Sequence, residues 1–254
     1  MDGDQIGRVT TSQTTFDVLD AVKRLEEACV TDVANELGLA KSTAHRHLTT
    51  LHDNEFLVRD GDAYHLSFRF LDLGEYVRGR RPLYRMASRK VQQVAEETGE
   101  RAQFMVEEHG QAVYIHVALG DHAVQTDSGL GRPMPMTAVS AGKAMLAFMP
   151  RDRVEDILDR RGLPRRTEET ITDRATLFEE LDRIAERGYA LNDGESTRGL
   201  RAVSVPVRGP DGEVAGALGV SGPTHRFRED RFRSELPEYL LGIGNELELD
   251  VQYR

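Results

Sequence analysis

The chain has 254 residues, of which 39% are hydrophobic and 30% are charged. At about 150 residues per domain, this length corresponds to one large or two smaller domains, and the apolar content excludes a wholly disordered chain. The single cysteine, Cys29, excludes an internal disulfide framework and a Cys-rich zinc site. The formal net charge of −10 argues at first sight against binding to nucleic acid.

Neither a membrane segment nor a secretory signal is expected. The longest apolar run, residues 144–149, is far shorter than the roughly 18 residues that a membrane helix needs. The N-terminus is acidic and polar and lacks the basic-then-apolar pattern of a signal peptide. These features predict a soluble, cytoplasmic protein without a membrane partner.

The chain begins with three predicted helices. In residues 14–28, apolar side chains recur at helical spacing and predict a buried face formed by Phe16, Leu19, Val22 and Leu25. Thr31 stands in the N-cap position of a short helix over 32–37, which Gly38 ends. A helix over 41–54 follows at once, with a face formed by Ala44, His47, Leu48 and Leu51. Two helices joined by a short glycine-containing turn form the helix-turn-helix pattern.

From residue 56 onward, apolar side chains recur at every second residue instead of at helical spacing. Residues 56–59 and 63–66 flank an Asp-Gly turn and predict a β-hairpin, which after a helix-turn-helix would be a wing. Helical spacing returns over 68–75, and the Gly-Arg-Arg-Pro segment 79–82 is typical of a linker. We expect three parts: a winged helix-turn-helix domain over 1–66, a linker helix over 67–82 and a second domain over 83–254.

The second domain mixes helical and alternating segments. Helices are predicted over 83–97, from 141 onward, and over 151–161, 175–187 and 236–249. Strands are predicted over 101–106, 113–117, 202–207 and 214–221, and a glycine- and proline-containing loop over 128–135. Helices combined with an antiparallel meander indicate an α+β or α/β sensor-like domain.

Several short motifs follow one another in a fixed order. The first is the run AKSTAHRHLTTL at 40–51. The second domain adds Pro135-Met136-Thr137, Gly142-Lys143-Ala144, Gly162-Leu163-Pro164, Arg187-Gly188-Tyr189-Ala190, Gly199-Leu200-Arg201 and Val220-Ser221-Gly222-Pro223. From about residue 14 to 226, the chain thereby resembles the IclR family of transcriptional regulators, whose recognition helix reads S-K-S-T-V-H-R-L-L-x-x-L. The resemblance implies a dimeric or tetrameric regulator with an N-terminal winged helix and a C-terminal GAF-like domain that binds a small metabolite.

The helix over 41–54 carries residues suited to DNA. Residues 40–48 contain two positive charges and no acid, and arginine can bind guanine O6 and N7. We expect DNA contacts from the helix and from two wing residues that would reach phosphate or the minor groove: Lys41, Ser42, Thr43, His45, Arg46, Thr49, Arg59 and His65. In the alternative interpretation, the motif serves protein interaction and Arg46 is a solvated surface residue. His47 is expected to be a partly buried helix residue.

The resemblance also implies a ligand pocket between the loop that precedes the Gly-Lys-Ala helix, the loop at 192–195 and the strand after Gly-Leu-Arg. Free backbone N–H groups at the start of that helix would favour an anion. The candidate effector-binding residues are Met136, Thr137, Ser140, Ala141, Gly142, Asn192, Asp193, Ala202 and Ser204. Thr137, Ala202 and Asn192 replace a frequent histidine, cysteine and aspartate of the family. The alternative is that these residues form a helix cap, core packing and a turn.

These features predict a sequence-specific DNA-binding regulator whose affinity for a palindromic operator is modulated by a small carboxylate or sugar-derived metabolite. The alternative is a ligand-independent regulator whose second domain serves only oligomerisation or partner recruitment. An enzyme is not expected, because residues 137–144 lack the first glycine and the final Ser/Thr of a P-loop. Residues 219–222 also lack the spacing of a nucleophile elbow, and Cys29 is expected to be structural. No cofactor is expected, and no metal site at His45, His47 and His52.

The balance of charged residues is unusual. The only lysines are Lys23, Lys41, Lys90 and Lys143, and acidic residues are spread along the whole chain. This composition is similar to that of proteins from extreme halophiles, and an origin in a halophilic archaeon is expected. An acidic protein on DNA lacks the usual advantage of counterion release, so we expect its DNA binding to depend weakly on salt or to strengthen as salt rises.

Overall fold

The computed structural model describes residue 7 and residues 9–124 and 129–253. The chain divides into two compact units, Met1–Val77 and Arg78–Arg254. Helix α4 (Arg69–Gly79) contributes residues to both units, and none of its residues is buried. The predicted loop at 128–135 begins at a residue that lies outside the described ones.

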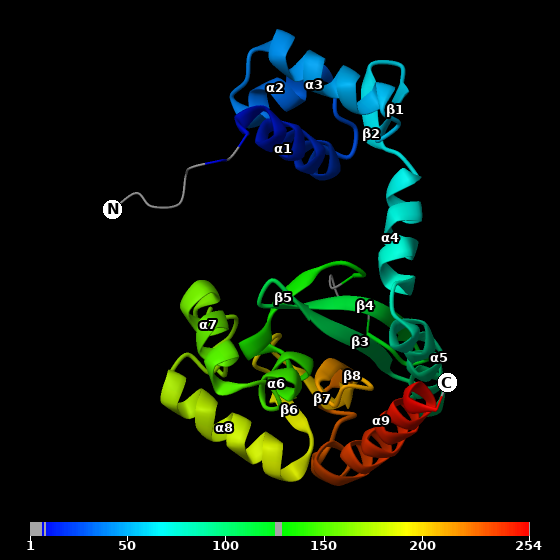
Figure 1. Ribbon diagram of the computed structural model, residues 1–254, viewed down its shortest axis with the longest axis vertical. Helices are drawn as coiled ribbons and strands as arrows, with labels where there is room; N and C mark the ends of the chain where they lie inside the picture. Colours follow the sequence, from blue (N-terminus) through cyan, green and yellow to red (C-terminus); the bar gives the residue numbers. More distant parts are fainter. Residues whose placement is uncertain (1–6, 8, 125–128, 254) are drawn as a thin grey trace. The chain divides into compact units, whose positions relative to one another are not determined.

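The N-terminal unit is a winged helix-turn-helix, as predicted (Figure 1). It consists of α1 (Thr10–Leu25), α2 (Val30–Leu37), α3 (Lys41–Asp53), β1 (Leu57–Asp60) and β2 (Ala63–Leu66). Gly38 adopts the left-handed conformation at φ 63° and ends α2, so that α3 can start three residues later. Gly61, at φ 57°, allows the tight turn of the antiparallel hairpin. One core joins the three helices to the hairpin through Val22, Leu48, Leu57 and other side chains.

Two local predictions for this unit were wrong. In α1, Val22 is buried and Leu19 and Leu25 pack against the core as predicted, but Phe16 is 62% exposed. Val18 and Ala21 complete the buried stripe instead. The small side chain of Ala21 lies at the centre of this stripe, and an apolar-spacing rule that counts large residues overlooks it. Thr31 is not the N-cap of α2: the helix begins one residue before it, and the backbone N–H of Cys29 donates to the carboxylate of Asp32 at 3.1 Å.

The C-terminal unit is built on a six-stranded antiparallel sheet with the strand order β5-β4-β3-β8-β7-β6. Its strands are β3 (Arg101–Glu108), β4 (Gln111–Leu119), β5 (Pro133–Pro135), β6 (Ala190–Asp193), β7 (Leu200–Arg208) and β8 (Val214–Pro223). Its helices are α5 (Pro82–Thr98), α6 (Ser140–Leu146), α7 (Arg151–Arg161), α8 (Arg174–Arg187) and α9 (Leu236–Gln252). Two short turns of other helix types cover Met136–Ala138 and Arg231–Glu235.

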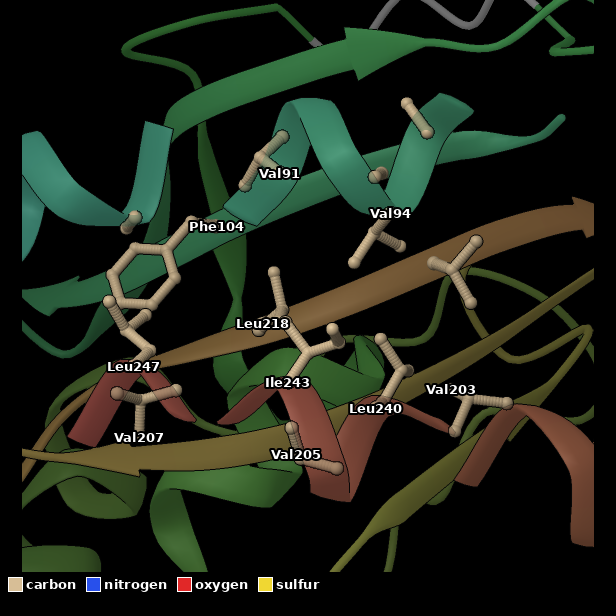
Figure 2. Close-up of a cluster of buried hydrophobic side chains, with 14 of the residues drawn as sticks. Val91, Val94, Phe104, Val203, Val205, Val207, Leu218, Leu240, Ile243 and Leu247 are labelled. Carbon is tan, nitrogen blue, oxygen red and sulfur yellow. The ribbon is translucent and has the colours of Figure 1, made fainter. Parts of the chain in front are cut away.

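The two faces of this sheet bury different side chains. One face packs against α5 and α9, and Figure 2 shows Phe104, Leu218 and Val205 of the sheet facing Val94 and other side chains of these helices. The opposite face packs against α6, which together with α7 and α8 forms a second apolar cluster around Met105. Since side chains alternate along a strand, the residues next to Phe104, Leu218 and Val205 in sequence point toward α6.

Besides the short turn Met136–Ala138, three elements of this unit were not predicted. Residues 190–193 form β6, an edge strand, so Asn192 lies within the sheet and not in a loop or turn. Strand β5 is only three residues long and contains two prolines, which suits an edge position but conceals it from periodicity. The π-helical turn before α9 buries Phe232, and a single buried residue gives no repeating signal. The predicted strands and long helices of the unit are confirmed apart from shifts at their ends.

Candidate functional site

Helix α3 presents a polar face on the side opposite its core contacts. Ala44, Leu48 and Leu51 are buried, while Lys41, Ser42, His45 and Arg46 are exposed and Thr43 and Thr49 are half-buried. Ser42, His45, Arg46 and Thr49 are spaced three and four residues apart and therefore share one helix face. All six of the candidate residues on this helix thus lie on or beside the surface that faces away from the core.

The positive charges of this face have no carboxylate partner among the described residues. Elsewhere in the same unit, Arg24 pairs with Glu36 at 3.2 Å and Arg69 with Glu55 at 3.7 Å. By contrast, the described part of the chain contains no ion pair or side-chain hydrogen bond of Lys41 or Arg46. Because an acidic protein offers many possible partners, these two unpaired side chains leave a local site at which a polyanion can bind.

The neighbouring His47 is half-buried, as expected, and its Nδ1 lies 2.9 Å from the hydroxyl of Thr15. This contact joins α3 to α1, which is also held to α3 by the core of the unit. These contacts fix the rotation of α3 about its own axis, and they lie on the side of the helix opposite its exposed residues.

The two candidate wing residues already bind other parts of the unit. Arg59 donates from Nε to the carbonyl of Gly61 at 2.8 Å and lies 3.2 Å from the carboxylate of Asp62. The Nδ1 of His65 lies 2.9 Å from the carbonyl oxygen of Glu26. Since a carbonyl oxygen can only accept, Nδ1 carries the proton, and Nε2 is the atom left for an outside contact. The contacts that the structure shows for Arg59 and His65 therefore stabilise the wing and its attachment to the rest of the unit.

In the C-terminal unit, a row of side chains crosses four strands on the face that packs against α6. The strand register places Arg101 of β3 opposite Ser221 of β8, Ser221 opposite Ala202 of β7, and Ala202 opposite Asn192 of β6. Residues directly opposite one another in a sheet point to the same face. All four residues line one cavity of about 50 Å³, at the wall of which Ser140 and Ala141 of α6 also lie.

The candidate effector residues divide into two groups. Ser140, Ala141, Asn192 and Ala202 line this cavity. Ser204 does not line it but contacts the lining residue Ser140 through their hydroxyl oxygens at 2.8 Å. The others do not line the cavity: Met136, Thr137, Gly142 and Asp193.

These four residues have structural contacts of their own. Met136 and Thr137 are buried in the turn before α6, and Thr137 Oγ1 has no hydrogen-bond partner within the described residues. Gly142 faces the backbone of Met136 so closely that no Cβ atom could fit between them. The carboxylate of Asp193 binds the guanidinium of Arg201 through two contacts, at 2.8 and 2.7 Å.

Sequence reasoning missed a large polar side chain that lines the cavity, that of Arg101. It is 5% exposed, and its guanidinium carbon lies 5.0 Å from the centre of the Tyr114 ring. The signal was present in the sequence: in the strand predicted over 101–106, Ala102, Phe104 and Val106 alternate with other residues, which must occupy the opposite face. Gln103, the next residue on that face, lines the cavity as well.

Asn192 brings a buried acceptor to the same cavity. Its side chain is 1% exposed, and Nδ2 donates to the carbonyl of Ala138 at 2.7 Å. This bond fixes which end of the amide is the nitrogen. The other end, Oδ1, is buried and accepts no hydrogen bond from any residue that the structure describes. A buried acceptor without a donor is costly, and a bound molecule or water can supply the donor.

A buried ion pair lies beside the cavity. Nζ of Lys143 is 2.5 Å from Oε1 of Glu195, and the two side chains are 1% and 11% exposed. The hydroxyl of Thr170 donates to the backbone carbonyl of Glu195 at 2.7 Å and fixes the loop. Burial raises the pKa of the Glu195 carboxyl above its ordinary 4.5, although the charge of Lys143 acts in the opposite direction.

Within residues 7, 9–124 and 129–253, no group of three or more His, Cys, Asp and Glu side chains is arranged to hold a metal ion. No helix in these same ranges is long and apolar enough to cross a membrane.

The comparisons with known proteins agree over nearly the whole chain. Residues 14–61 match the model described as the IclR helix-turn-helix domain, and residues 76–247 match that of the bacterial transcriptional regulator IclR C-terminal domain. The chain is 28% identical to a probable HTH-type transcriptional regulator ArcR of Halobacterium salinarum over 249 residues, 96% of this chain and 95% of that protein. It is 30% identical to the HTH-type transcriptional regulator KdgR of Escherichia coli over 220 residues, 86% of this chain and 84% of KdgR.

Solved structures show the same architecture. The crystal structure of Thermotoga maritima IclR superposes with a TM-score of 0.82 at 25% identity, covering 97% of this chain and all of that one (100%). An IclR homologue of Microbacterium hydrocarbonoxydans, solved as a complex with 4-hydroxybenzoate, has a TM-score of 0.83 at 23% identity and covers 96% and 100% of the two chains. With a family model matched over more than half of its length, this chain belongs to the IclR family of transcriptional regulators.

Proposed function

We propose that the protein binds a specific DNA sequence through α3 and that a small metabolite in the C-terminal unit modulates this binding. The observation that carries the first part is the exposed face of α3, where Arg46 and Lys41 have no ion-pair partner among the described residues. An arginine on the exposed face of a recognition helix can bind the O6 and N7 atoms of guanine in the major groove.

Selection from random duplexes tests this proposal and does not require the operator sequence to be known. The wild-type protein is expected to enrich a single, roughly palindromic motif, because two-fold symmetric dimers bind two half-sites. Arg46→Ala is expected to lose that enrichment, whereas Arg24→Ala, which removes an exposed arginine of α1, keeps it. Equal enrichment by the wild type and Arg46→Ala would exclude Arg46 from recognition.

The second part of the proposal assigns the cavity beside α6 as the metabolite site. Its supports are the buried Arg101 and the unsatisfied Oδ1 of Asn192, together with the ligand seen in the Microbacterium homologue. A ligand that prefers one arrangement of the dimer changes DNA affinity by its coupling free energy, typically about 1–3 kcal/mol. The DNA affinity would then change by roughly fivefold to 150-fold.

One observation favours a second candidate, in which the C-terminal unit serves only oligomerisation or partner recruitment. The cavity of about 50 Å³ is far smaller than the roughly 300–1,000 Å³ that drug-sized ligands occupy. A thermal-shift screen of carboxylates and sugars separates the two, because a ligand at 100 times its Kd stabilises a protein by about 2.7 kcal/mol. An absence of any shift, with DNA binding intact, would favour the second candidate.

We also propose that the protein acts as a homodimer or homotetramer. The support is the linker helix α4. None of its residues is buried within this chain, and its apolar side chains Leu71 and Tyr76 are 64% and 77% exposed. Such apolar exposure is typical of surfaces that another chain covers.

Sedimentation of a Leu71→Lys, Tyr76→Lys variant should show a smaller assembly than the wild type. Leu130→Lys, at a residue that is 53% exposed in the C-terminal unit, is the control. An unchanged assembly of the double variant would exclude α4 from the interface.

A further inference from the structure

The C-terminal unit contains a second, larger cavity, with a volume of about 620 Å³. This arginine groove is formed by residues 81–89 at the start of α5, by the β7–β8 turn at 209–213 with the first residues of β8, and by the end of α9. Among the described residues, it has no lining residue in common with the cavity beside α6. Small-molecule sites enclose roughly 300–1,000 Å³, so a whole metabolite fits into the arginine groove.

One side of the arginine groove is a row of three arginines. Arg81, Arg85 and Arg89 follow one another at intervals of four residues, so they share one helix face and extend over about 12 Å. Within the part of the chain that the structure describes, none of them forms an ion pair. The guanidinium carbon of Arg81 lies 5.6 Å from the centre of the Tyr84 ring, and Arg85 donates to the carbonyl of Gly79. In an acidic protein, three such cations favour an anionic ligand.

The length of this row indicates what kind of anion fits. A guanidinium binds a phosphate through two parallel N–H groups, which gives arginine a preference for planar recognition of phosphate. A ligand with one phosphate or one carboxylate leaves part of the row without a counter-charge, whereas a chain of phosphates can engage successive arginines. The row therefore favours a polyphosphate.

The floor of the groove is apolar and belongs to the core of the unit. Leu83 is 3% exposed, and Met86, Ala215 and Val251 pack against the same core cluster. Because the core holds these side chains in place, the floor is preformed. Inorganic polyphosphate would leave this surface uncovered, whereas an organic ring attached to the phosphates would bury it.

Another side of the groove carries two carboxylates, those of Asp211 and Glu213 on the β7–β8 turn. The backbone N–H of Gly209 donates to the carbonyl of Glu213 at 2.8 Å, and that of Glu213 donates to Oδ1 of Asp211 at 3.1 Å, so the turn is fixed. The carboxylate of Glu213 has no ion pair or hydrogen bond with any residue that the structure describes. A carboxylate repels phosphate but accepts hydrogen bonds from hydroxyl and amino groups. This side therefore disfavours an acidic peptide and favours a ligand that carries donors away from its phosphates.

We infer that the arginine groove binds a nucleoside polyphosphate. The phosphate chain binds Arg81, Arg85 and Arg89, the base covers the apolar floor, and hydroxyl or amino groups of the nucleoside donate to Glu213. This class of metabolite combines a chain of anions, a flat ring and several hydrogen-bond donors, which are the three properties that the groove requires. The site is separate from the cavity beside α6, so the inference goes beyond the proposed function and does not depend on it.

The test uses the full-length wild-type protein and four probes in calorimetric titrations without divalent cations: ATP, AMP, adenosine and tripolyphosphate. ATP should bind most tightly. AMP, with one phosphate, and tripolyphosphate, without a nucleoside, should each bind at least roughly tenfold more weakly, and adenosine should not bind. Any of these three binding as tightly as ATP would overturn the inference, and so would an absence of ATP binding. A heptaglutamate peptide that binds more tightly than ATP would make the groove a docking surface for an acidic protein and would also overturn it.

Variants locate the bound ATP. Arg85→Gln and Arg89→Gln should each weaken ATP binding by roughly tenfold, while their melting temperatures stay close to that of the wild type. Arg160→Gln, which removes an exposed arginine of α7 outside the groove, should bind ATP as the wild type does.

Arg46→Ala separates the groove from the exposed face of α3, the other place at which the described residues leave arginine without an ion pair. It should keep its ATP affinity. Loss of ATP binding in Arg46→Ala, or wild-type affinity in both Arg85→Gln and Arg89→Gln, would overturn the inference. If neither groove variant folds, the four-probe series on the wild type decides alone.

Discussion

The ammonium group of Lys143 on α6 binds the carboxylate of Glu195 in the loop after β6, so one buried ion pair joins the two segments that flank the cavity. Ser140 lies at the start of the first segment and Asn192 in the strand before the second, and both line the cavity wall. The pair therefore ties together the two segments that flank the candidate ligand site.

Breaking this pair on one side should be more harmful than removing both charges. Glu195→Leu leaves the charge of Lys143 buried without a partner, which is expected to lower the free energy of unfolding by about 3–5 kcal/mol. Lys143→Met combined with Glu195→Leu should lower it by less than the single change does. Denaturant unfolding measures both, and Glu168→Leu, in an exposed pair with Arg198, is the control, with an expected effect of at most about 1 kcal/mol. A double variant no more stable than the single variant would contradict this account.

The pH dependence of stability reports on the same carboxyl. Because burial raises the pKa of folded Glu195 above the ordinary 4.5, the folded state holds this proton more tightly than the unfolded state does. The contribution of Glu195 to stability is therefore fully present below pH 4.5 and is lost as the pH rises through the raised pKa. The difference in unfolding free energy between the wild type and Glu195→Gln should fall over that range.

The matched control for this measurement is Glu179→Gln, which removes an exposed carboxylate of α8. A difference between the wild type and Glu195→Gln that instead grows as the pH rises would mean that Lys143 lowers the pKa of Glu195 by more than burial raises it.

Most of the architecture could be predicted from the sequence, because its signals are local. Gly38, Gly61 and the periodicity of the surrounding residues predict the winged helix-turn-helix. The partners of individual side chains could not be predicted in this way. That Asn192 lies in an edge strand, at the other end of a register row from Arg101, depends on strand pairing between segments far apart in sequence. The start of α2 shows the same limit at short range: Thr31 was predicted as the N-cap, whereas the backbone N–H of Cys29 donates to the carboxylate of Asp32.

Gly142 was a candidate ligand residue, and the structure gives it a packing contact with Met136 instead of a place on the cavity wall. Gly142→Ala should lower the unfolding free energy by about 1–3 kcal/mol or more, because two backbone segments must separate to admit the methyl group. Gly242→Ala is the matched control, since a Cβ atom there meets nothing within 4 Å. It should raise the unfolding free energy by up to about 1 kcal/mol through helix propensity. Gly142→Ala with wild-type stability would contradict the observed packing.

Salt should weaken DNA binding much less than it does for basic regulators. Asp53 at the end of α3 and Asp60 in the wing are exposed in the same unit as the two cations of α3, and they repel phosphate. Potassium ions screen this repulsion, which offsets the loss of counterion release. The affinity for the selected DNA should therefore fall little, or rise, between low and molar KCl, and a steep loss would refute the expectation.

Removing one of these acids sharpens that experiment. Asp60→Asn should bind more tightly than the wild type at low salt and should lose affinity faster as KCl is added. Asp156→Asn removes an exposed carboxylate of the C-terminal unit and should follow the wild-type curve. Identical curves for all three proteins would mean that the wing acid does not face DNA.

The most direct measurement of the central claim is the affinity of wild-type protein, Arg46→Ala and Arg24→Ala for the selected DNA and for each of its single base-pair substitutions. At the base pair that Arg46 contacts, a base substitution should cost wild-type protein and Arg24→Ala about 1–3 kcal/mol of binding free energy. Arg46→Ala should bind all base pairs at that position equally well and should still discriminate at the other positions. An Arg46→Ala profile that matches the wild type at every position would contradict the claim that the exposed face of α3 reads DNA.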